Sequence, residues 1–333
     1  MRSNSTTTNP RQHSLNTWTR KKRDALRVAD RLESAGYPDR AARMRECSRI
    51  IATRSCPNGH THRVVEAFFC RDRACPICAW RVARRSAGRL CAALSDVGGR
   101  ALLLTLTIRS CPASELRSVI RDLLRSWSRF ARRSRVRGAF DGWFRSLELT
   151  FNPHTNEWHP HLHAILHVAD PAAYFREGSG LYLTHAEIIE LWRSAARLDY
   201  SPSVDIRAVR SWRAALEVAK YATKSADILS LTESADVKAW VMAVHGTRQY
   251  GASGVYRAAL AAVEAAAQDD LLHHDDDTAA AVCPVCGAAL ITVEWIYEGN
   301  IYRRMESGCE HGRHGGSSTP RIHGDHGGGD DRT

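Results

Sequence analysis

His161 and His163 are separated by one apolar residue, and their spacing suggests chemistry more directly than any other feature of this 333-residue chain. Successive side chains of a β-strand point to opposite faces, so both imidazoles would lie on one face. Across a hairpin, the carboxylate of Glu148 would reach the histidine pair. Two imidazoles and one carboxylate leave coordination positions open for water or phosphate oxygens, which predicts a Mg²⁺ or Mn²⁺ site. A histidine-rich strand face without metal and a non-haem iron site are the alternatives.

A second group of reactive side chains follows further along the chain. Glu217, Lys220, Tyr221 and Lys224 are spaced as neighbours on one face of a helix. Nearby ammonium groups favour the phenolate of a tyrosine, and its attack on a phosphate would give a covalent phosphotyrosine. The lysines could balance phosphoryl charge, and Glu217 could activate a water or accept a proton. The alternative is a solvated helix face without catalytic function.

The elements that must position these residues follow from hydrophobic periodicity. Thr184 and Glu187 form the pattern of a capping box, which predicts that a helix begins there. The order of elements, βαββαβα, predicts an α+β fold of the split βαβ type, with a mostly antiparallel sheet and helices on one face. The predicted strands are 102–108, 145–151, 158–168 and 203–209, and the predicted helices are 79–96, 116–135, 184–198, 211–225 and 233–267, the last interrupted at 246–254.

These motifs resemble the rolling-circle plasmid replication initiators of the HUH endonuclease superfamily, in the branch with a single catalytic tyrosine. The resemblance implies that His161, His163 and Glu148 hold the metal and that Tyr221 is the nicking nucleophile. It also implies that Glu217 assists a terminating cleavage by water and that Lys224 positions the phosphate. Four blocks carry it, in the order of the family: Leu104-Thr-Leu-Thr107, Glu148 with His159-Pro-His-Leu-His163, Glu217-Val-Ala-Lys-Tyr221-Ala-Thr-Lys224, and His245-Gly-Thr-Arg-Gln-Tyr250.

The function that the resemblance implies is a metal-dependent, site-specific nickase and religase that acts at a plasmid double-strand origin. The 5′ end would stay on tyrosine, and the 3′-hydroxyl would prime the host polymerase. The implied partners are single-stranded and hairpin origin DNA, a host helicase and a DNA polymerase, with a homodimer as one option. A transposase or relaxase of the same superfamily is one alternative, and a zinc-dependent, origin-binding repressor without nuclease activity is another.

Ten cysteines in a chain without a recognisable export signal favour metal binding over disulfides. The first candidate zinc site consists of Cys56, Cys70, Cys75 and Cys78, and His60 or Cys47 could replace one of them. The second, which resembles a zinc ribbon, consists of Cys283, Cys286, Cys309 and His311 or His314. Buried free cysteines are the alternative.

The net charge of +11 predicts a polyanionic partner. No apolar run is long enough to span a membrane, and we expect a cytoplasmic protein. Aromatic and basic residues between 127 and 143 suggest either a strip for single-stranded DNA or a core helix with solvated arginines. The expected organisation is a basic helical arm (1–54), a cysteine-rich module and helix (55–96), a nuclease core (98–268), an acidic linker (269–281), a possible zinc ribbon (282–314) and a disordered tail (315–333).

Overall fold

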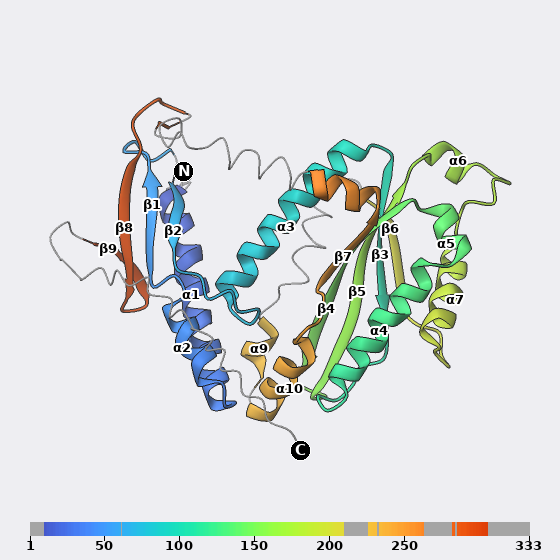
Figure 1. Ribbon diagram of the computed structural model, residues 1–333, viewed down its shortest axis with the longest axis horizontal. Coiled ribbons are helices and arrows are strands. Elements are labelled where there is room, and N and C mark those ends of the chain that lie inside the picture. The colour runs from blue at the N-terminus through green and yellow to red at the C-terminus, as the bar shows by residue number, and fades with distance from the viewer. Residues whose placement is uncertain are drawn as a thin grey trace, which may run out of the picture.

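The computed structural model describes residues 10–60, 62–209, 226–231, 233–262, 282–283 and 285–305. Two antiparallel sheets organise this part of the chain, and the long helix α3 (Pro76–Val97) runs between them (Figure 1). The α+β class and the mostly antiparallel sheet predicted from the sequence are therefore confirmed. The larger sheet has the strand order β6 (Val204–Ala208), β3 (Arg100–Thr107), β5 (Glu157–Val168), β4 (Gly142–Asn152) and β7 (Tyr250–Gly254).

One face of the five-stranded sheet is covered by two helices, α4 (Leu116–Ala131) and α7 (His185–Ala196). Leu162, Ala164 and Leu166 occupy every second position of β5. Their side chains all point to this face, because side chains of a strand alternate between faces with a period of two. They join one core with the apolar stripe of α4, whose spacing predicts an amphipathic helix. That stripe consists of Leu116, Ile120, Leu123, Trp127 and Phe130, all buried.

The opposite face of the sheet carries a smaller core, so helices do not lie on one face alone. Leu103, Phe144 and Ile165 lie side by side there, one on each of three neighbouring strands. Leu90 of α3 and Tyr256, in the helical residues 255–262, pack against them. The C-terminal half of α3 therefore belongs to the core of the large sheet.

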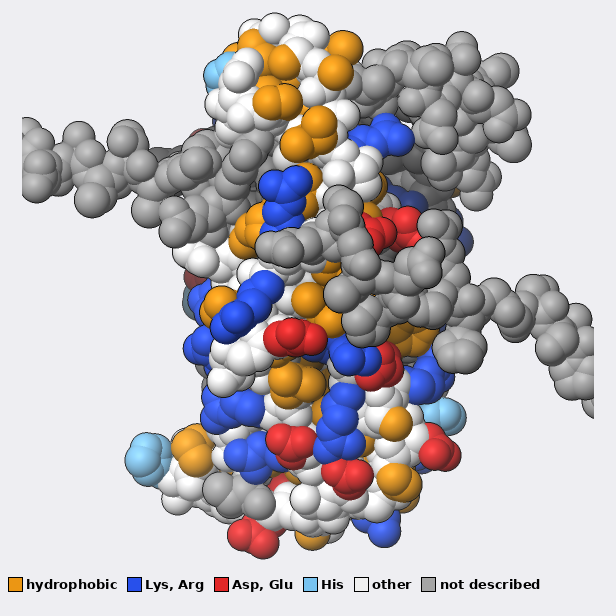
Figure 2. Space-filling view, turned by 90° about the vertical axis from the view of Figure 1, so that its left-hand side faces the viewer, with side chains coloured by type: hydrophobic (Ala, Val, Ile, Leu, Met, Phe, Trp, Pro, Cys, Tyr) orange, Lys and Arg blue, Asp and Glu red, His pale blue; other side chains and the backbone are white. Residues whose placement is uncertain are grey.

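The second sheet joins the two ends of the described chain. Its order is β2 (His62–Ala67), β1 (Ile50–Ser55), β8 (Ile291–Glu298) and β9 (Ile301–Arg304). The sequence predicts two separate cysteine-rich modules, whereas β1 pairs with β8 along its whole length and places both in one sheet. Figure 2 looks onto this side of the molecule, where basic and acidic side chains alternate with apolar ones.

The N-terminal helices α1 (Pro10–Ser34) and α2 (Pro38–Glu46) confirm the prediction of basic helices in this region. The helical prediction was wrong for residues 50–54, which belong to β1. Ile50 and Ile51 are β-branched, and the pairing with β8 buries Ile51 in the core. Pairing with a strand that is distant in the sequence therefore determines the conformation of residues 50–54.

Short helices connect the N-terminal helices to the large sheet. The α1 helix contacts α9 (Ala226–Ser230) and α10 (Ser234–Val244), and Arg31 donates a hydrogen bond to the carbonyl of Leu229 at 3.1 Å. After α10, residues 250–254 form the edge strand β7, where the sequence predicts only an interruption between helices. Among the residues described, no helix is both long enough and apolar enough to cross a bilayer.

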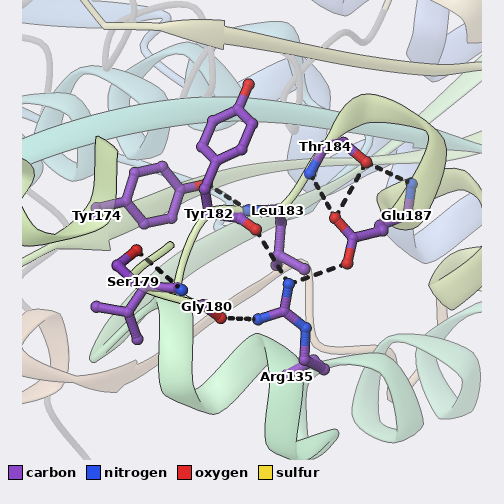
Figure 3. Close-up of polar contacts among 9 residues, drawn as sticks. Arg135, Tyr174, Ser179, Gly180, Tyr182, Leu183, Thr184 and Glu187 are labelled. Carbon is purple, nitrogen blue, oxygen red and sulfur yellow. Dashed lines mark hydrogen bonds and ion pairs between the residues drawn. The ribbon is translucent and has the colours of Figure 1, made fainter. Parts of the chain in front are cut away.

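The predicted capping box at the start of α7 is present. The side chain of Thr184 accepts the backbone N–H of Glu187, and the Glu187 carboxylate accepts the backbone N–H of Thr184 at 2.9 Å (Figure 3). Arg135 of α5 (Ser134–Ala139) donates to the same carboxylate at 2.9 Å and to the carbonyls of Tyr182 and Gly180. This guanidinium ties the segment after α6 (Pro171–Phe175) to both helices.

We predict that Thr184→Ala lowers the free energy of unfolding by about 1 kcal/mol, because an N-cap hydroxyl is lost. Urea unfolding followed by tryptophan fluorescence would measure the change. Ser128→Ala is the matched control, since the exposed Ser128 hydroxyl donates to the Leu124 carbonyl of its own helix. The control should stay within about 0.5 kcal/mol of the wild type, and an equal loss in both variants would contradict the role of the cap.

Candidate metal centres

The histidine pair and Glu148 meet because of the strand register. In the pairing of β4 with β5, Glu148 stands directly opposite His161. In the pairing of β3 with β5, Thr107 stands opposite His161, and Thr105 stands opposite His163. These side chains therefore form two adjacent rows across three strands, on the face opposite α4 and α7.

The nitrogen atoms of both histidines converge on one oxygen atom. His161 Nε2 lies 2.7 Å from Glu148 Oε2, and His163 Nε2 lies 2.8 Å from the same oxygen. The three side chains are only 12%, 9% and 2% exposed, in the order His161, His163 and Glu148. The structure thus brings together the three residues that the sequence predicts as metal ligands.

The other ring nitrogens of the histidines orient them for metal binding. His161 Nδ1 lies 3.0 Å from the carbonyl oxygen of His159, which can only accept, so Nδ1 donates this hydrogen bond and Nε2 is the nitrogen left to bind a metal ion. His163 Nδ1 lies 3.1 Å from the Thr105 hydroxyl. Hydrogen bonds of this kind hold metal-ligating histidines in place. Burial, with a smaller contribution from His161, lowers the pKa of His159.

This donor set fits a divalent metal ion that also binds phosphate oxygens. Two imidazole nitrogens and one carboxylate oxygen supply three ligands and leave further positions for water or substrate. Mg²⁺ prefers ligands that are all oxygen, whereas imidazole is a common ligand of transition metals. The other predicted site residues, Tyr221, Glu217 and Lys224, lie outside the described residues.

A second group of side chains consists of four buried cysteines, Cys47, Cys70, Cys75 and Cys78. The sulfur atoms of Cys47 and Cys75, of Cys47 and Cys78, and of Cys70 and Cys78 each lie 3.7 Å apart. Sulfur atoms bound tetrahedrally to one Zn²⁺ at about 2.3 Å lie about 3.8 Å apart, so the group fits zinc. The sequence prediction put Cys56 in this group, whereas the structure puts the alternative, Cys47, in that place.

The surroundings of the four cysteines also suit the negative charge of one zinc ion bound by four thiolates. The backbone N–H of Cys70 points to Cys47 Sγ at 3.5 Å. The ammonium group of Lys22 is buried beside the group and donates to the carbonyls of Arg45 and Cys47, the latter at 2.7 Å. Burial lowers the pKa of Lys22, and the neighbouring Cys47 and Cys75 act in the opposite direction.

A third group joins residues from the two ends of the described chain. Cys56 and His60 lie beside Cys283 and Cys286. The sequence prediction completed the Cys283–Cys286 pair with Cys309 and His311, which lie outside the described residues. The structure places Cys56 and His60 next to that pair, because β1 and β8 are neighbours in the sheet.

Comparison with known proteins agrees with the resemblance. The family model described as "Replication protein" matches residues 61–300 of the chain. The chain belongs to this replication-protein family. It is 31% identical over 218 residues to a protein from Streptococcus pneumoniae named "Protein rep", a match that covers 62% of this chain and 67% of the relative.

Other relatives of this replication protein carry the same name. A "Protein rep" from Lactiplantibacillus plantarum is 30% identical over 258 residues, which is 72% of this chain and 80% of the relative. A "Protein rep" from Staphylococcus aureus is 26% identical over 190 residues, covering 55% and 82% of the two chains. No solved structure matches. The predicted resemblance to rolling-circle plasmid initiators is confirmed at the level of the family.

The basic and aromatic segment between residues 127 and 143 is divided between core and surface. Trp127 and Phe130 are buried beneath the sheet, as expected for a core helix. Arg129 and Arg133 hold α7 through the carbonyl of Ala195 and the hydroxyl of Ser194. A pocket remains, lined in part by Arg132, Arg137 and Trp143.

Two features of this replication protein were not anticipated from its sequence. Thr105 was recognised only as part of a family motif, although its alternation with Thr107 along β3 places it opposite His163. The partnership of Cys56 and His60 with Cys283 and Cys286 was also missed, because it depends on pairing between strands far apart in the chain.

We predict that the purified replication protein contains zinc and that Cys47→Ser lowers the zinc content by one equivalent per chain. Serine cannot supply the thiolate that closes the group of Cys47, Cys70, Cys75 and Cys78. Inductively coupled plasma mass spectrometry on the folded protein would measure this. Cys91→Ser, on α3 and outside all three groups, is the control and should retain all of the zinc. An unchanged zinc content in Cys47→Ser would exclude this ligand set.

Proposed function

We propose that this chain starts rolling-circle replication of a plasmid by nicking one DNA strand at the double-strand origin. The supporting observation is the convergence of His161 Nε2 and His163 Nε2 on the Glu148 carboxylate. It lies within the segment that matches the replication-protein family. Such a metal site suits chemistry on a phosphate, because phosphate oxygens can complete the ligand shell.

The chemistry proposed for the metal site is activation of the scissile phosphate. Glu148, His161 and His163 would hold Mn²⁺ or Mg²⁺, which supplies positive charge to a phosphate oxygen when bound. The protein fixes the ligands before the DNA arrives, since Thr105 and the His159 carbonyl hold both rings. Such preorganisation avoids the cost of reorienting dipoles during the reaction.

Tyr221 is the proposed nucleophile. Its phenolic oxygen would form a bond to the phosphorus as the bond from phosphorus to the 3′ oxygen breaks. The phenolic proton is lost and the departing oxygen gains one, so the products are a 5′-phosphotyrosine and a 3′-hydroxyl primer. Lys224 would balance the charge on the phosphoryl oxygens, and Glu217 would activate water for the terminating cleavage.

The basic surface of α3 is the proposed contact with DNA phosphates. Arg84 and Arg85 are exposed there, and the guanidinium of Arg81 stacks 3.4 Å above the ring of Phe69. Because α3 begins at the four-cysteine group and ends under the large sheet, DNA held along it would lie close to both. Proposed partners are single-stranded and hairpin origin DNA, a host helicase and a host polymerase.

We predict that Glu148→Gln weakens Mn²⁺ binding by about tenfold or more, because the shared anionic ligand becomes a neutral amide of the same size. Titration of the protein without added zinc, with free Mn²⁺ followed by electron paramagnetic resonance, would measure the affinity. His154→Gln, an exposed histidine in the turn between β4 and β5, is the control and should bind Mn²⁺ normally. Equal affinities in all three proteins would exclude the proposed metal site.

We predict that Tyr221→Phe abolishes a covalent adduct that the wild type forms with origin DNA, because phenylalanine has no hydroxyl. The full chain would be incubated with Mn²⁺ and single-stranded oligonucleotides tiled across its own replicon. Denaturing gels would then show a protein joined to the 5′ end. Tyr200→Phe is the matched control.

The same gels separate the alternatives. Adduct formation at the replication origin of the plasmid supports an initiator, whereas adducts formed only at transposon ends or at a transfer origin would support a transposase or relaxase. Tight binding to origin duplex with no adduct on any oligonucleotide would contradict the nickase and support a repressor.

A further inference from the structure

We propose that Cys56, His60, Cys283 and Cys286 form a second zinc site, which fastens the C-terminal cysteine segment to the N-terminal sheet. The site has three thiolates and one imidazole, from loops at the same end of one sheet. It is distinct from the four-cysteine group and from the Glu148 site. The inference does not depend on the proposed nuclease activity.

The spacing of the ligand atoms fits tetrahedral zinc. Cys56 Sγ lies 3.5 Å from Cys286 Sγ, and His60 Nδ1 lies 3.9 Å from Cys56 Sγ and from Cys283 Sγ. Tetrahedral bonds of about 2.3 Å to sulfur and about 2.0 Å to nitrogen separate two sulfurs by about 3.8 Å and sulfur from nitrogen by about 3.6 Å. Each distance agrees within a few tenths of an ångström. The sulfur separation is far longer than a disulfide bond.

The backbone around Cys283 and Cys286 has the turn that a metal-binding pair needs. The N–H of Gly287 donates to the carbonyl of Cys283 at 2.8 Å, and the N–H of Cys283 donates to the carbonyl of Ala288 at 2.8 Å. Gly287 has φ of 68°, a left-handed conformation that glycine adopts without steric cost. This turn directs both thiol groups to the same side.

A similar turn presents Cys56 and His60. The N–H of Gly59 donates to the carbonyl of Cys56 at 3.0 Å, and Gly59 has φ of 82°. The side-chain amide of Asn58 donates to Cys286 Sγ at 3.5 Å, as expected for a group that stabilises a thiolate. The two halves of the site therefore already contact each other through a polar side chain.

The sheet register explains why residues 230 positions apart meet. Ser55, at the end of β1, pairs with Ile291, at the start of β8. Cys56 follows Ser55 directly, and the Cys283–Cys286 turn precedes Ile291. Antiparallel pairing thus brings the turn to the same edge as Cys56.

A zinc ion at this position would act as a cross-link between the two ends of the described chain. Like other cross-links, it would restrict the unfolded chain, and its binding energy would become folding energy for the small sheet. The four atoms would supply the four ligands of a tetrahedral zinc site. The proposal assigns to Cys56 and His60 the ligand positions that the sequence prediction gave to Cys309 and His311, which lie outside the described residues.

The first test is the number of zinc ions per chain. Native mass spectrometry of the zinc-loaded full chain should show one zinc ion fewer in Cys283→Ser than in the wild type. Cys91→Ser controls for the loss of a thiol elsewhere and should retain as many zinc ions as the wild type. An equal number of zinc ions in Cys283→Ser and in the wild type would overturn the proposal.

The second test changes one ligand to another residue that can still bind the metal ion. In the Co²⁺-substituted full chain, His60→Cys should shift the visible d–d bands and add the charge-transfer absorption of one thiolate, because sulfur replaces nitrogen on the metal. The matched control, His311→Cys, should leave the spectrum unchanged. An unchanged spectrum in His60→Cys, or a shift in His311→Cys, would assign the fourth ligand elsewhere and overturn the proposal.

Discussion

The pairing of β5 with β3 on one side and β4 on the other is the constraint on which the rest of the structure depends. It sets Glu148 opposite His161 and Thr105 opposite His163, so ligands and their supporting groups lie in neighbouring rows. Side chains alternate between faces with a period of two. A slip of one residue would therefore turn the histidines into the core beneath α4 and α7 and bring Leu162 out. The same register that buries the core thus also builds the candidate metal site.

Helix α3 connects that sheet to the cysteine-rich part of the molecule. Cys75 is its N-cap residue, Cys78 lies in its first turn, and its C-terminal half packs Leu90 against Leu103 and Ile165. The four-cysteine group therefore fixes the N-terminal end of α3, and the C-terminal end of α3 packs on the sheet face that carries the metal ligands. Small modules often need a metal because their apolar core is too small to stabilise them alone. Here the module also shares its core with α1, through contacts that include Trp18 and Trp80.

Much of the large sheet could be predicted from local patterns. Strands β3 to β6 and helices α4 and α7 lie where the hydrophobic periodicity predicts, and the capping box of Thr184 and Glu187 is present. Strand β7 was missed because its residues Tyr250 to Gly254 are rich in glycine and small side chains, which carry little periodicity. They become a strand because the edge of β4 offers hydrogen-bonding partners. Residues 50–54 of β1 were predicted to be helical because the strand that they pair with, β8, lies far along the chain and leaves no local signal.

The sequence by itself determined the chemistry that is available: which side chains can bind metal, which faces of the strands they share, and the family to which the chain belongs. Glu148, His161 and His163 could be grouped because they lie on adjacent strands of one hairpin, where spacing specifies distance. Only the tertiary structure decided how the cysteines are divided. Cys47 joins Cys70 because β1 pairs with β2 and the N–H of Ser48 donates to the carbonyl of Phe68, and Cys56 joins Cys286 because β1 pairs with β8. Local spacing carries no information about contacts between segments that are distant along the chain.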